Sequence, residues 1–232
     1  MKSQIKVLLK KIFKIIKSLD DDDKNIRLEL QRRAIVETAD YIRSNLSNVK
    51  STDSTKSVHE IAINNINIKS GIIIELGVHT GATINMISSK IRNYKIYGFD
   101  SFQGLPEDWR DGITKKTFDN IDIPKVNKNV VLHKGWFAET LPQFISSLPD
   151  KKIPIAYLHV DCDIYSSTKV AFESFRENII SGTVIVFDEY FNYDGWKSHE
   201  FKAFQEFVSS EKLKYKYLTY NYRGEQVAIK IL

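Results

Sequence analysis

Hydrophobic residues are spaced in two different ways along the chain, and the change comes near residue 70. Before it, apolar residues recur every three or four positions, which is typical of amphipathic helices. After it, short and nearly continuous apolar runs alternate with segments of helical spacing. Such runs indicate strands buried on both faces, and their alternation with helices predicts a parallel sheet covered on both sides.

The expected elements of this second part can be placed along the sequence. Strands are predicted at 71–77, 95–100, 129–135, 155–161 and 182–189, and helices at 83–91, 139–148, 166–179 and 198–212. The last residues predict two strands around an Asn-Tyr-Arg-Gly turn, which favours an antiparallel pair. We therefore expect an α/β fold with a mostly parallel, seven-stranded sheet that ends in an antiparallel hairpin. A dinucleotide dehydrogenase would instead continue with parallel strands.

The first 69 residues are predicted to form a helical extension ahead of a domain at 70–232. A basic amphipathic helix is expected at 2–19, and a second helix at about 24–46. The polar stretch SNVKSTDSTKS that follows is predicted to be a loop or linker.

The net charge of +5 is concentrated at the N-terminus. Residues 1–19 contain six lysines and no acidic residue, so they carry +6 and the rest of the chain sums to about −1. A basic surface spread over the fold, as nucleic-acid binding requires, is therefore not indicated. The basic helix could lie on an anionic membrane surface, or it could pack against its own domain or a partner subunit.

The single cysteine, Cys162, excludes an internal disulfide framework and fits a reducing compartment. Lysines interrupt every apolar run near the start of the chain, which makes a poor secretory signal. No stretch approaches the ~18 apolar residues of a membrane span. We expect a cytoplasmic protein, with peripheral contact to the inner membrane face through residues 2–19 as an open alternative.

Four predicted strands end in an acidic residue, namely Glu75, Asp100, Asp161 and Asp188. In doubly wound sheets, ligands bind beyond the carboxyl ends of the strands. Parallel strands would bring these carboxylates to one edge of the sheet. A single acid at a strand end is often only a cap or loop residue, but four of them indicate a site.

The stretch GIIIELGVHTGATINMI, residues 71–87, places a glycine turn between a buried strand and a helix. Glycines there would let a ligand touch the backbone. The turn lacks the G-x-G-x-x-G of dinucleotide-binding folds and the Gly-Lys-Ser/Thr of a phosphate loop. Glu75 directly before it would repel an anion. S-adenosylmethionine fits better, because it brings positive charge and ribose hydroxyls that Asp100 could accept.

At this point the residues resemble a known family. ELGVHTGAT resembles motif I of class I S-adenosylmethionine-dependent methyltransferases, in the version of the catechol-type O-methyltransferases. Four further stretches resemble the macrocin-type sugar O-methyltransferases: YGFDSFQGLP (97–106), KGWFAETLP (134–142), HVDCDIYSSTKVA (159–171) and GTVIVFDEYFNYDGW (182–196). The resemblance covers about residues 70–231 and implies a Rossmann-like class I methyltransferase fold.

The resemblance also implies which residues bind S-adenosylmethionine. The implied residues are Glu75, Gly77, Thr80, Gly81, Thr83, Asp100, Ser101, Gly135, Trp136, Phe137 and Asp161. Among them, Thr83 stands where a hydroxyl meets the methionine carboxylate, and Asp100 stands where the ribose is held. Trp136 and Phe137 would lie against the adenine.

A divalent cation is implied at Asp161, Asp188 and Glu189. Asp161 and Asp188 resemble the strand-end aspartates of metal-dependent members, whereas Glu189 stands where catechol-type enzymes have asparagine. Oxygen ligands of this kind suit Mg²⁺. The ion would lower the pKa of an acceptor hydroxyl and fix its direction.

The proton acceptor is left open between several residues. Catechol-type enzymes carry a lysine where this chain has Ile164. Asp163 and His199 together are our candidates for catalysis, and His79 in the glycine turn could also reach the reacting face. Aromatic residues in DEYFNYDGW (188–196) could form a stacking wall for a sugar ring, or they could pack the following helix.

The sequence therefore predicts an S-adenosylmethionine-dependent, Mg²⁺-dependent O-methyltransferase that acts on a hydroxyl of a sugar or another polyhydroxylated small molecule. A nucleic-acid or protein acceptor is the main alternative, although DCDIY is not the motif that holds a flipped base in amino-methylating enzymes. A membrane-associated protein without enzymatic activity is a third alternative. The resembled families also imply a homo-oligomer.

Overall fold

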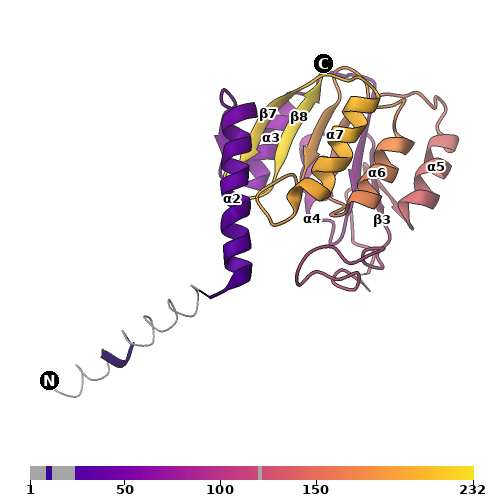
Figure 1. Cartoon of the computed structure of the whole chain (residues 1–232). Coiled ribbons are helices and arrows are strands. Elements are labelled where there is room, and N and C mark those ends of the chain that lie inside the picture. The colour runs from indigo at the N-terminus through magenta and orange to yellow at the C-terminus, as the bar shows by residue number, and fades with distance from the viewer. Residues whose placement is uncertain (1–8, 12–23, 120–121) are drawn as a thin grey trace.

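The computed structural model describes residues 9–11, 24–119 and 122–232 (Figure 1). Most of the helix predicted at 2–19 lies outside these residues, and residues 9–11 are helical and exposed. The second predicted helix is present as α2 (Ile26–Asn45). Asn25 caps it by accepting the backbone N–H of Leu28. No helix in the described ranges is long and apolar enough to cross a membrane.

One eight-stranded sheet forms the centre of the fold, in the order β1-β7-β8-β6-β5-β2-β3-β4. Its strands are β1 (Ser51–Thr52), β2 (Ile72–Leu76), β3 (Ile96–Asp100), β4 (Val130–Lys134), β5 (Ile155–Val160), β6 (Val184–Phe187), β7 (Tyr215–Asn221) and β8 (Val227–Ile231). Only β8 runs against its neighbours, because it pairs antiparallel with both β6 and β7. This confirms the mostly parallel sheet with a terminal antiparallel hairpin.

The predicted number of seven strands is wrong by one. β1 lies in the stretch predicted to be a loop, and it pairs parallel with β7 at the edge of the sheet. Its backbone also accepts a hydrogen bond, because the N–H of Tyr222 donates to the carbonyl of Thr52. A strand of two residues is too short to show an alternating pattern, so the sequence gives no sign of it.

Helices cover both faces of the sheet (Figure 1). They are α3 (Thr55–Asn64), α4 (Ala82–Lys90), α5 (Phe137–Ser147), α6 (Tyr165–Ser174) and α7 (Glu200–Ser210), with a 3-10 turn at Trp196–Ser198. α3 starts within the stretch predicted to be a loop, where the Ser54 hydroxyl accepts the N–H of Ser57. It packs against β6, β7 and β8 through Val58, His59 and Ala62.

Alternate residues of the strands belong to two separate hydrophobic cores, one on each face of the sheet. Ile74, Leu158 and Phe187 pack with α5, α6 and α7 on one face. Ile73 and Val186 pack with α3 and α4 on the other face. Every residue of β2, β5 and β6 is buried, as expected for strands covered on both sides.

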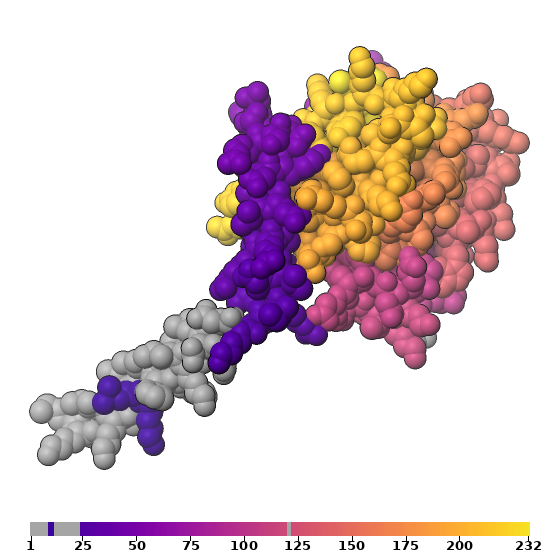
Figure 2. Space-filling view, viewed as in Figure 1, coloured from indigo at the N-terminus to yellow at the C-terminus, as the bar shows by residue number. Residues whose placement is uncertain are grey.

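α2 lies along the side of this body, where Figure 2 shows it as a ridge beside the region of α7. Thr38 accepts the backbone N–H of Asn192, and the hydroxyls of Tyr41 and Tyr217 share a hydrogen bond. The long helix is therefore held to the loop after β6 and to the terminal hairpin.

The carboxyl ends of the central strands meet at one edge. Backbone hydrogen bonds continue past the strands there, from Asp161 N–H to Leu76 and from Asp188 N–H to Val160, each at 2.9 Å. Gly77 N–H donates to Phe99 in the same way. The predicted strand-end residues are thus adjacent in space.

Candidate active site

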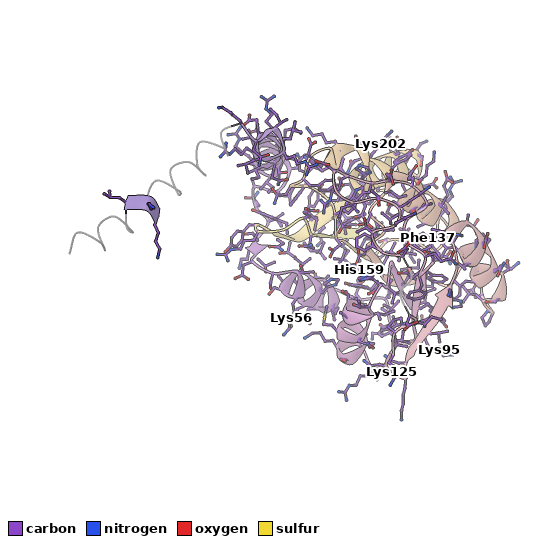
Figure 3. All side chains as sticks on the ribbon, turned by 90° about the horizontal axis from the view of Figure 1, so that it is seen from below. Lys56, Lys95, Lys125, Phe137, His159 and Lys202 are labelled. Atoms are coloured by element: carbon purple, nitrogen blue, oxygen red, sulfur yellow. The ribbon has the colours of Figure 1, made fainter. Side chains whose placement is uncertain are left out.

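A cavity of about 520 Å³ opens at this edge of the sheet. The residues predicted for a site that line it are Gly77, Asp100, Ser101, Gly135, Trp136, Phe137, Asp161, Asp163 and Glu189. They come from the ends of five parallel strands, β2 to β6, and from the start of α5, where Figure 3 labels Phe137. The cavity lining therefore combines aromatic rings with Asp100 and three further acidic residues, Asp161, Asp163 and Glu189.

Gly77 is required by the backbone around it. Its φ is +87°, and a Cβ atom there would lie 1.7 Å from the carbonyl oxygen of Asp161. Gly81 has a φ of +78°, and its Cβ would lie 3.0 Å from Pro124. Both positions favour glycine because of chain geometry, whereas only Gly77 also lines the cavity.

Asp100 links the glycine turn to the loop after β3. Its Oδ2 accepts the backbone N–H groups of Val78 and His79 at 2.8 and 2.7 Å, and its Oδ1 accepts that of Phe102 at 2.6 Å. Ser101 in turn donates its hydroxyl to the carbonyl of Gly104. Because a carboxylate offers about four acceptor sites, Asp100 keeps capacity for a hydroxyl in the cavity.

Asp161, Asp163 and Glu189 form an acidic group on the cavity wall, which we call the cavity carboxylates. One oxygen from each lies within 4.8 Å of the others. Burial and the neighbouring Asp188 raise the pKa of Asp161 well above its ordinary value, and burial raises that of Asp163 to about 7. The pKa of Glu189 is raised by burial and by Asp161.

This arrangement fits a divalent cation. The cavity carboxylates offer only oxygen donors, and the Oε2 atom of Glu189 is buried without a hydrogen-bond partner among the described residues. Close carboxylates repel one another when ionised, and a bound cation would relieve that repulsion. The donor set therefore suits Mg²⁺ or a similar ion.

Glu200, which the sequence reasoning missed, holds the cavity carboxylates in place from the first turn of α7. Its Oε1 accepts the N–H of Cys162 and its Oε2 accepts that of Glu189, both at 3.2 Å. It is fully buried, and burial raises its pKa to about 8. In the sequence, an acid in the first turn of a helix indicates only a favourable contact with the helix dipole.

Asp188 does not line the cavity and is not one of the cavity carboxylates. Its Oδ2 accepts the side-chain N–H of Gln226 at 3.1 Å, and its Oδ1 lies 3.8 Å from Nε2 of His159. Asp188 continues the alternation of Val184 and Val186, which face α3, so Glu189 is the residue that faces the cavity. Asp163 takes the place in the acidic group that the sequence assigned to Asp188.

Four residues expected to bind the cofactor lie outside the cavity lining: Glu75, Thr80, Gly81 and Thr83. Glu75 is buried, and its Oε2 lies 3.2 Å from Nδ1 of His159. Like Asp188, it lies on the face of the sheet that α3 and α4 cover, because it alternates with Ile73. An acidic residue at the end of a strand can therefore bond to a buried side chain instead of facing the ligand.

Of the two catalytic candidates, Asp163 lines the cavity and His199 does not. The His199 ring is half-buried, with its centroid 6.4 Å from that of Trp109, and its Nδ1 has no hydrogen-bond partner in the described part of the chain. Burial and the nearby Arg110 lower its pKa. His79 lines the cavity, edge-on to Phe118.

The aromatic residues at 188–196 do not form a stacking wall for a sugar ring, so that alternative is wrong. Its members, Tyr190, Phe191, Tyr193 and Trp196, are at most 2% exposed, and none of them lines the cavity. They pack the region around α7, which was the alternative interpretation. Between 188 and 196, only Glu189 lines the cavity.

The long connection between β3 and β4 supplies the other wall, which sequence reasoning did not identify. Its lining residues include Phe102, Trp109, Arg110, Ile113 and Phe118. Arg110 stacks 4.0 Å from the centre of the Trp109 ring and pairs with Glu225 at 2.9 Å. A connection of this length in an α/β fold is often functional, and that was the available signal.

Comparisons with known proteins identify the family and the fold. A family model described as a methyltransferase domain matches residues 74–190. The crystal structure of CalS11, a calicheamicin methyltransferase, has a TM-score of 0.60 at 21% identity and covers 75% of this chain and 77% of that one. The O-methyltransferase NovP has a TM-score of 0.54 at 21% identity, covering 75% of this chain and 76% of its own. The comparison with curated proteins gives no match.

Proposed function

This chain belongs to the family of methyltransferase domains, and from that premise we propose that it is an S-adenosylmethionine-dependent O-methyltransferase acting on a sugar hydroxyl. The single observation that carries the proposal is the cavity at the sheet edge, whose lining combines Asp100 and aromatic rings with the cavity carboxylates.

The part of the cavity lining formed by Trp136, Phe137 and Asp100 would hold the adenosyl group of S-adenosylmethionine. Trp136 and Phe137 offer aromatic surface for the adenine, and Asp100 offers acceptor oxygens for the ribose hydroxyls. The acidic surroundings favour the positive charge of the sulfonium and amino groups. Gly77 lines the cavity and has no side chain, so S-adenosylmethionine could approach the backbone closely there.

Asp161 and Glu189 would hold a divalent cation beside the donor. The ion would supply Lewis acidity that lowers the pKa of the acceptor hydroxyl and fixes its orientation. Both carboxylates are buried enough that protonation is favoured when no cation is near. Metal binding would therefore be linked to proton release.

Asp163 is our proposed general base. It lines the cavity beside the other two carboxylates, and in the metal-free protein burial raises its pKa to about 7, within the range that suits a general base. Its carboxylate would take the proton from the acceptor hydroxyl as the oxygen attacks the methyl carbon. The carbon–sulfur bond would break at the same time, and its electron pair would stay on the sulfur of S-adenosylhomocysteine. Holding the acceptor hydroxyl and the methyl group of the donor together in one cavity would supply much of the rate enhancement.

A sugar acceptor is supported by the walls of the cavity and by the related structures. Trp109 and Phe118 offer flat apolar surface, which suits the faces of a sugar ring. One structure of CalS11 is described as a TDP-rhamnose 3'-O-methyltransferase, with a TM-score of 0.55. We extend that substrate class, a hydroxyl of a nucleotide-linked or free sugar, to this chain.

The test is a screen of nucleotide sugars with S-adenosylmethionine and Mg²⁺, read by mass spectrometry as a gain of one methylene unit. The full-length protein should methylate at least one sugar, and Asp163→Asn should lose the activity while keeping its affinity for the donor. Asp194→Asn, at an exposed position, is the control that should stay active. Methylation of tRNA or DNA with no sugar product would contradict the proposal.

We also propose that residues 2–19 contact an anionic membrane surface and that the protein is a homo-oligomer. The support for membrane contact is the run of six lysines on a helical apolar pattern. Co-sedimentation with anionic vesicles, comparing the full chain with a chain starting at Asp20, tests the first statement. Light scattering tests the second.

A further inference from the structure

A second group of side chains that can bind a metal ion lies inside the fold, outside the cavity lining but next to the cavity carboxylates. It consists of His59 on α3, His159 on β5 and Asp188 after β6, and we call it the interior triad. One ligand atom from each lies within 4.8 Å of the others, and Nε2 of His159 is 3.8 Å from Oδ1 of Asp188. None of the three lines the cavity, and Figure 3 labels His159 in the interior.

From this geometry we infer that the interior triad is a second, nitrogen-rich metal site for a transition-metal ion such as Zn²⁺. The inference does not depend on the proposed methyl transfer. It rests on the orientation of the two histidine rings, on their buried nitrogen atoms and on the carboxylate that faces them.

Both rings are held as metal-binding histidines usually are. Nδ1 of His159 lies 3.2 Å from the carboxylate of Glu75, and Nδ1 of His59 lies 2.5 Å from the hydroxyl of Tyr157. Metal-ligating histidines commonly donate the N–H of one nitrogen to an oxygen, which fixes the ring and leaves the other nitrogen for the ion. With the proton on Nδ1, the Nε2 atom of each ring keeps a lone pair that can bind a metal ion.

These two Nε2 atoms lack hydrogen-bond partners among the described residues, although both side chains are 0% exposed. Buried polar atoms are normally paired, so two unpaired nitrogens at one place require an explanation. Protonation of His159 between Glu75 and Asp188 would account for one of them. It would leave Nε2 of His59 unpaired, and a shared metal ion accounts for both.

The donor set selects the class of ion. Two imidazole nitrogens with one carboxylate suit Zn²⁺ or another transition metal, whereas the all-oxygen cavity carboxylates suit Mg²⁺. Ligands at about 2.0–2.1 Å from a tetrahedral ion would lie ~3.4 Å apart, so the triad needs to contract slightly on binding. A fourth position would remain for water or another ligand.

The place of the triad indicates a structural role. His59 belongs to α3, which lies outside the matched residues 74–190, whereas His159 belongs to β5 and Asp188 directly follows β6. A bound ion would therefore fasten α3 to the ends of β5 and β6. Asp188 is also fixed by the side chain of Gln226, and its neighbour Glu189 faces the cavity.

The experiment uses Co²⁺ as a spectroscopic probe of the full-length protein. Metal-free protein in excess Mg²⁺, at about pH 8, is titrated with Co²⁺ and its visible absorption is recorded. We expect one equivalent of Co²⁺ with the intense bands of a four- or five-coordinate site containing nitrogen. Zn²⁺ should displace it, and metal analysis should then find one Zn²⁺ per chain.

Variants distinguish the triad from other sites. His59→Gln and His159→Gln should each weaken Co²⁺ binding at least ~100-fold, and Glu75→Gln, which changes only a ring partner, by ~10–100-fold. His133→Gln is the matched control, because Nε2 of His133 is also buried and unpaired but belongs to no such group. Circular dichroism of the metal-free variants checks that they fold.

Three results would overturn the inference. The first is a wild-type protein that binds no Co²⁺ when Mg²⁺ is present. The second is Co²⁺ binding of equal strength in folded His59→Gln and His159→Gln. The third is Co²⁺ binding that survives in both histidine variants and is lost in Asp161→Asn, which would place the ion in the cavity.

Discussion

Oε2 of Glu200 accepts the backbone N–H of Glu189 at 3.2 Å, while its Oε1 accepts that of Cys162. One buried side chain at the start of α7 thereby joins the loop after β6 to the loop after β5. Those two loops carry Asp161, Asp163 and Glu189. The position of the cavity carboxylates is consequently set by Glu200, which does not line the cavity itself.

Glu200→Gln should therefore impair catalysis without contacting any ligand. An amide can keep one of the two hydrogen bonds, but its NH₂ group would face a second backbone N–H. We expect kcat to fall by ~10–100-fold, as for other residues that position metal ligands, while the Kd for S-adenosylmethionine changes little. Steady-state kinetics and calorimetric titration measure the two quantities.

Glu206→Gln on the same helix is the control for that change. Its side chain is 49% exposed, and its polar partners in the described part of the chain are Tyr165 and Lys202, so the variant should keep wild-type kcat. Equal activity of the Glu200 and Glu206 variants would show that Glu200 is not needed to position the cavity carboxylates.

Gly77→Ala should damage the fold and the site together. A methyl group there would meet the carbonyl of Asp161 at 1.7 Å, and the φ of +87° is strained for alanine. Gly195→Ala is matched to it, because that φ is +80° and nothing lies within 4 Å of the added Cβ. The second variant should lose only the ~1–2 kcal/mol of backbone strain.

Urea unfolding of both variants measures the difference. Gly77→Ala should lose clearly more unfolding free energy than Gly195→Ala, and its donor binding should fail because Asp161 must move. Equal losses in the two variants would contradict the close packing of the β2 and β5 ends.

The metal-free protein should become less stable as pH rises from about 6.5 to about 8, above the range in which the lowered pKa values of His59, His133 and His199 act in the opposite direction. Burial raises the pKa of Glu200 from 4.5 to about 8 and that of Asp163 from 3.8 to about 7. A raised folded pKa means that stability is fully present below the unfolded value and is lost as pH rises through the folded value. The raised pKa of His159 acts in the same direction.

Thermal melting in excess chelator across this range tests the pH dependence. We expect Tm to fall by at least ~2–4 °C, the shift that 1 kcal/mol produces in a chain of this size. Glu200→Gln should flatten the profile, since the amide does not titrate. A Tm that rises steadily over the same range would be inconsistent with carboxyl groups that favour their protonated form when folded.

Arg110→Gln should move the acidic limb of the activity profile to higher pH. Burial raises the pKa of Asp163, and the Arg110 guanidinium opposes this. Without that charge the carboxyl would stay protonated to higher pH, so kcat at neutral pH should fall and recover in alkaline buffer. Arg223→Gln, where the arginine stacks on Tyr222 and lies outside the cavity lining, should leave the profile unchanged.

The sequence predicted the elements that carry a strong hydrophobic pattern. β2, β5 and β6 are continuous apolar runs and lie where they were expected. β1 has only two residues and leaves no readable period. α3 does have apolar residues at helical spacing, Val58, Ile61 and Ala62, and the sequence interpretation did not use them. Their places are fixed by pairing with the distant hairpin and packing on the sheet, which a local pattern does not contain.

The site was predictable to the extent that parallel strands must end at one edge. That rule brought Asp100, Asp161 and Glu189 to the cavity. It does not say to which side each side chain turns, and Glu75 and Asp188 follow the alternation of their strands to the face covered by α3. Glu200 is recognisable only once its burial is known, because an acid at a helix start is ordinary.

The most direct test of the central claim compares methyl transfer with and without a divalent cation while donor binding is measured in the same samples. With an acceptor sugar, wild-type protein should transfer methyl groups in Mg²⁺ and lose at least ~100-fold of kcat in excess chelator, a loss of the size expected when the main electrostatic stabilisation is removed. S-adenosylmethionine should still bind, and Asp161→Asn should behave in Mg²⁺ like the wild type in chelator. Full transfer in chelator would contradict the account of the cavity carboxylates.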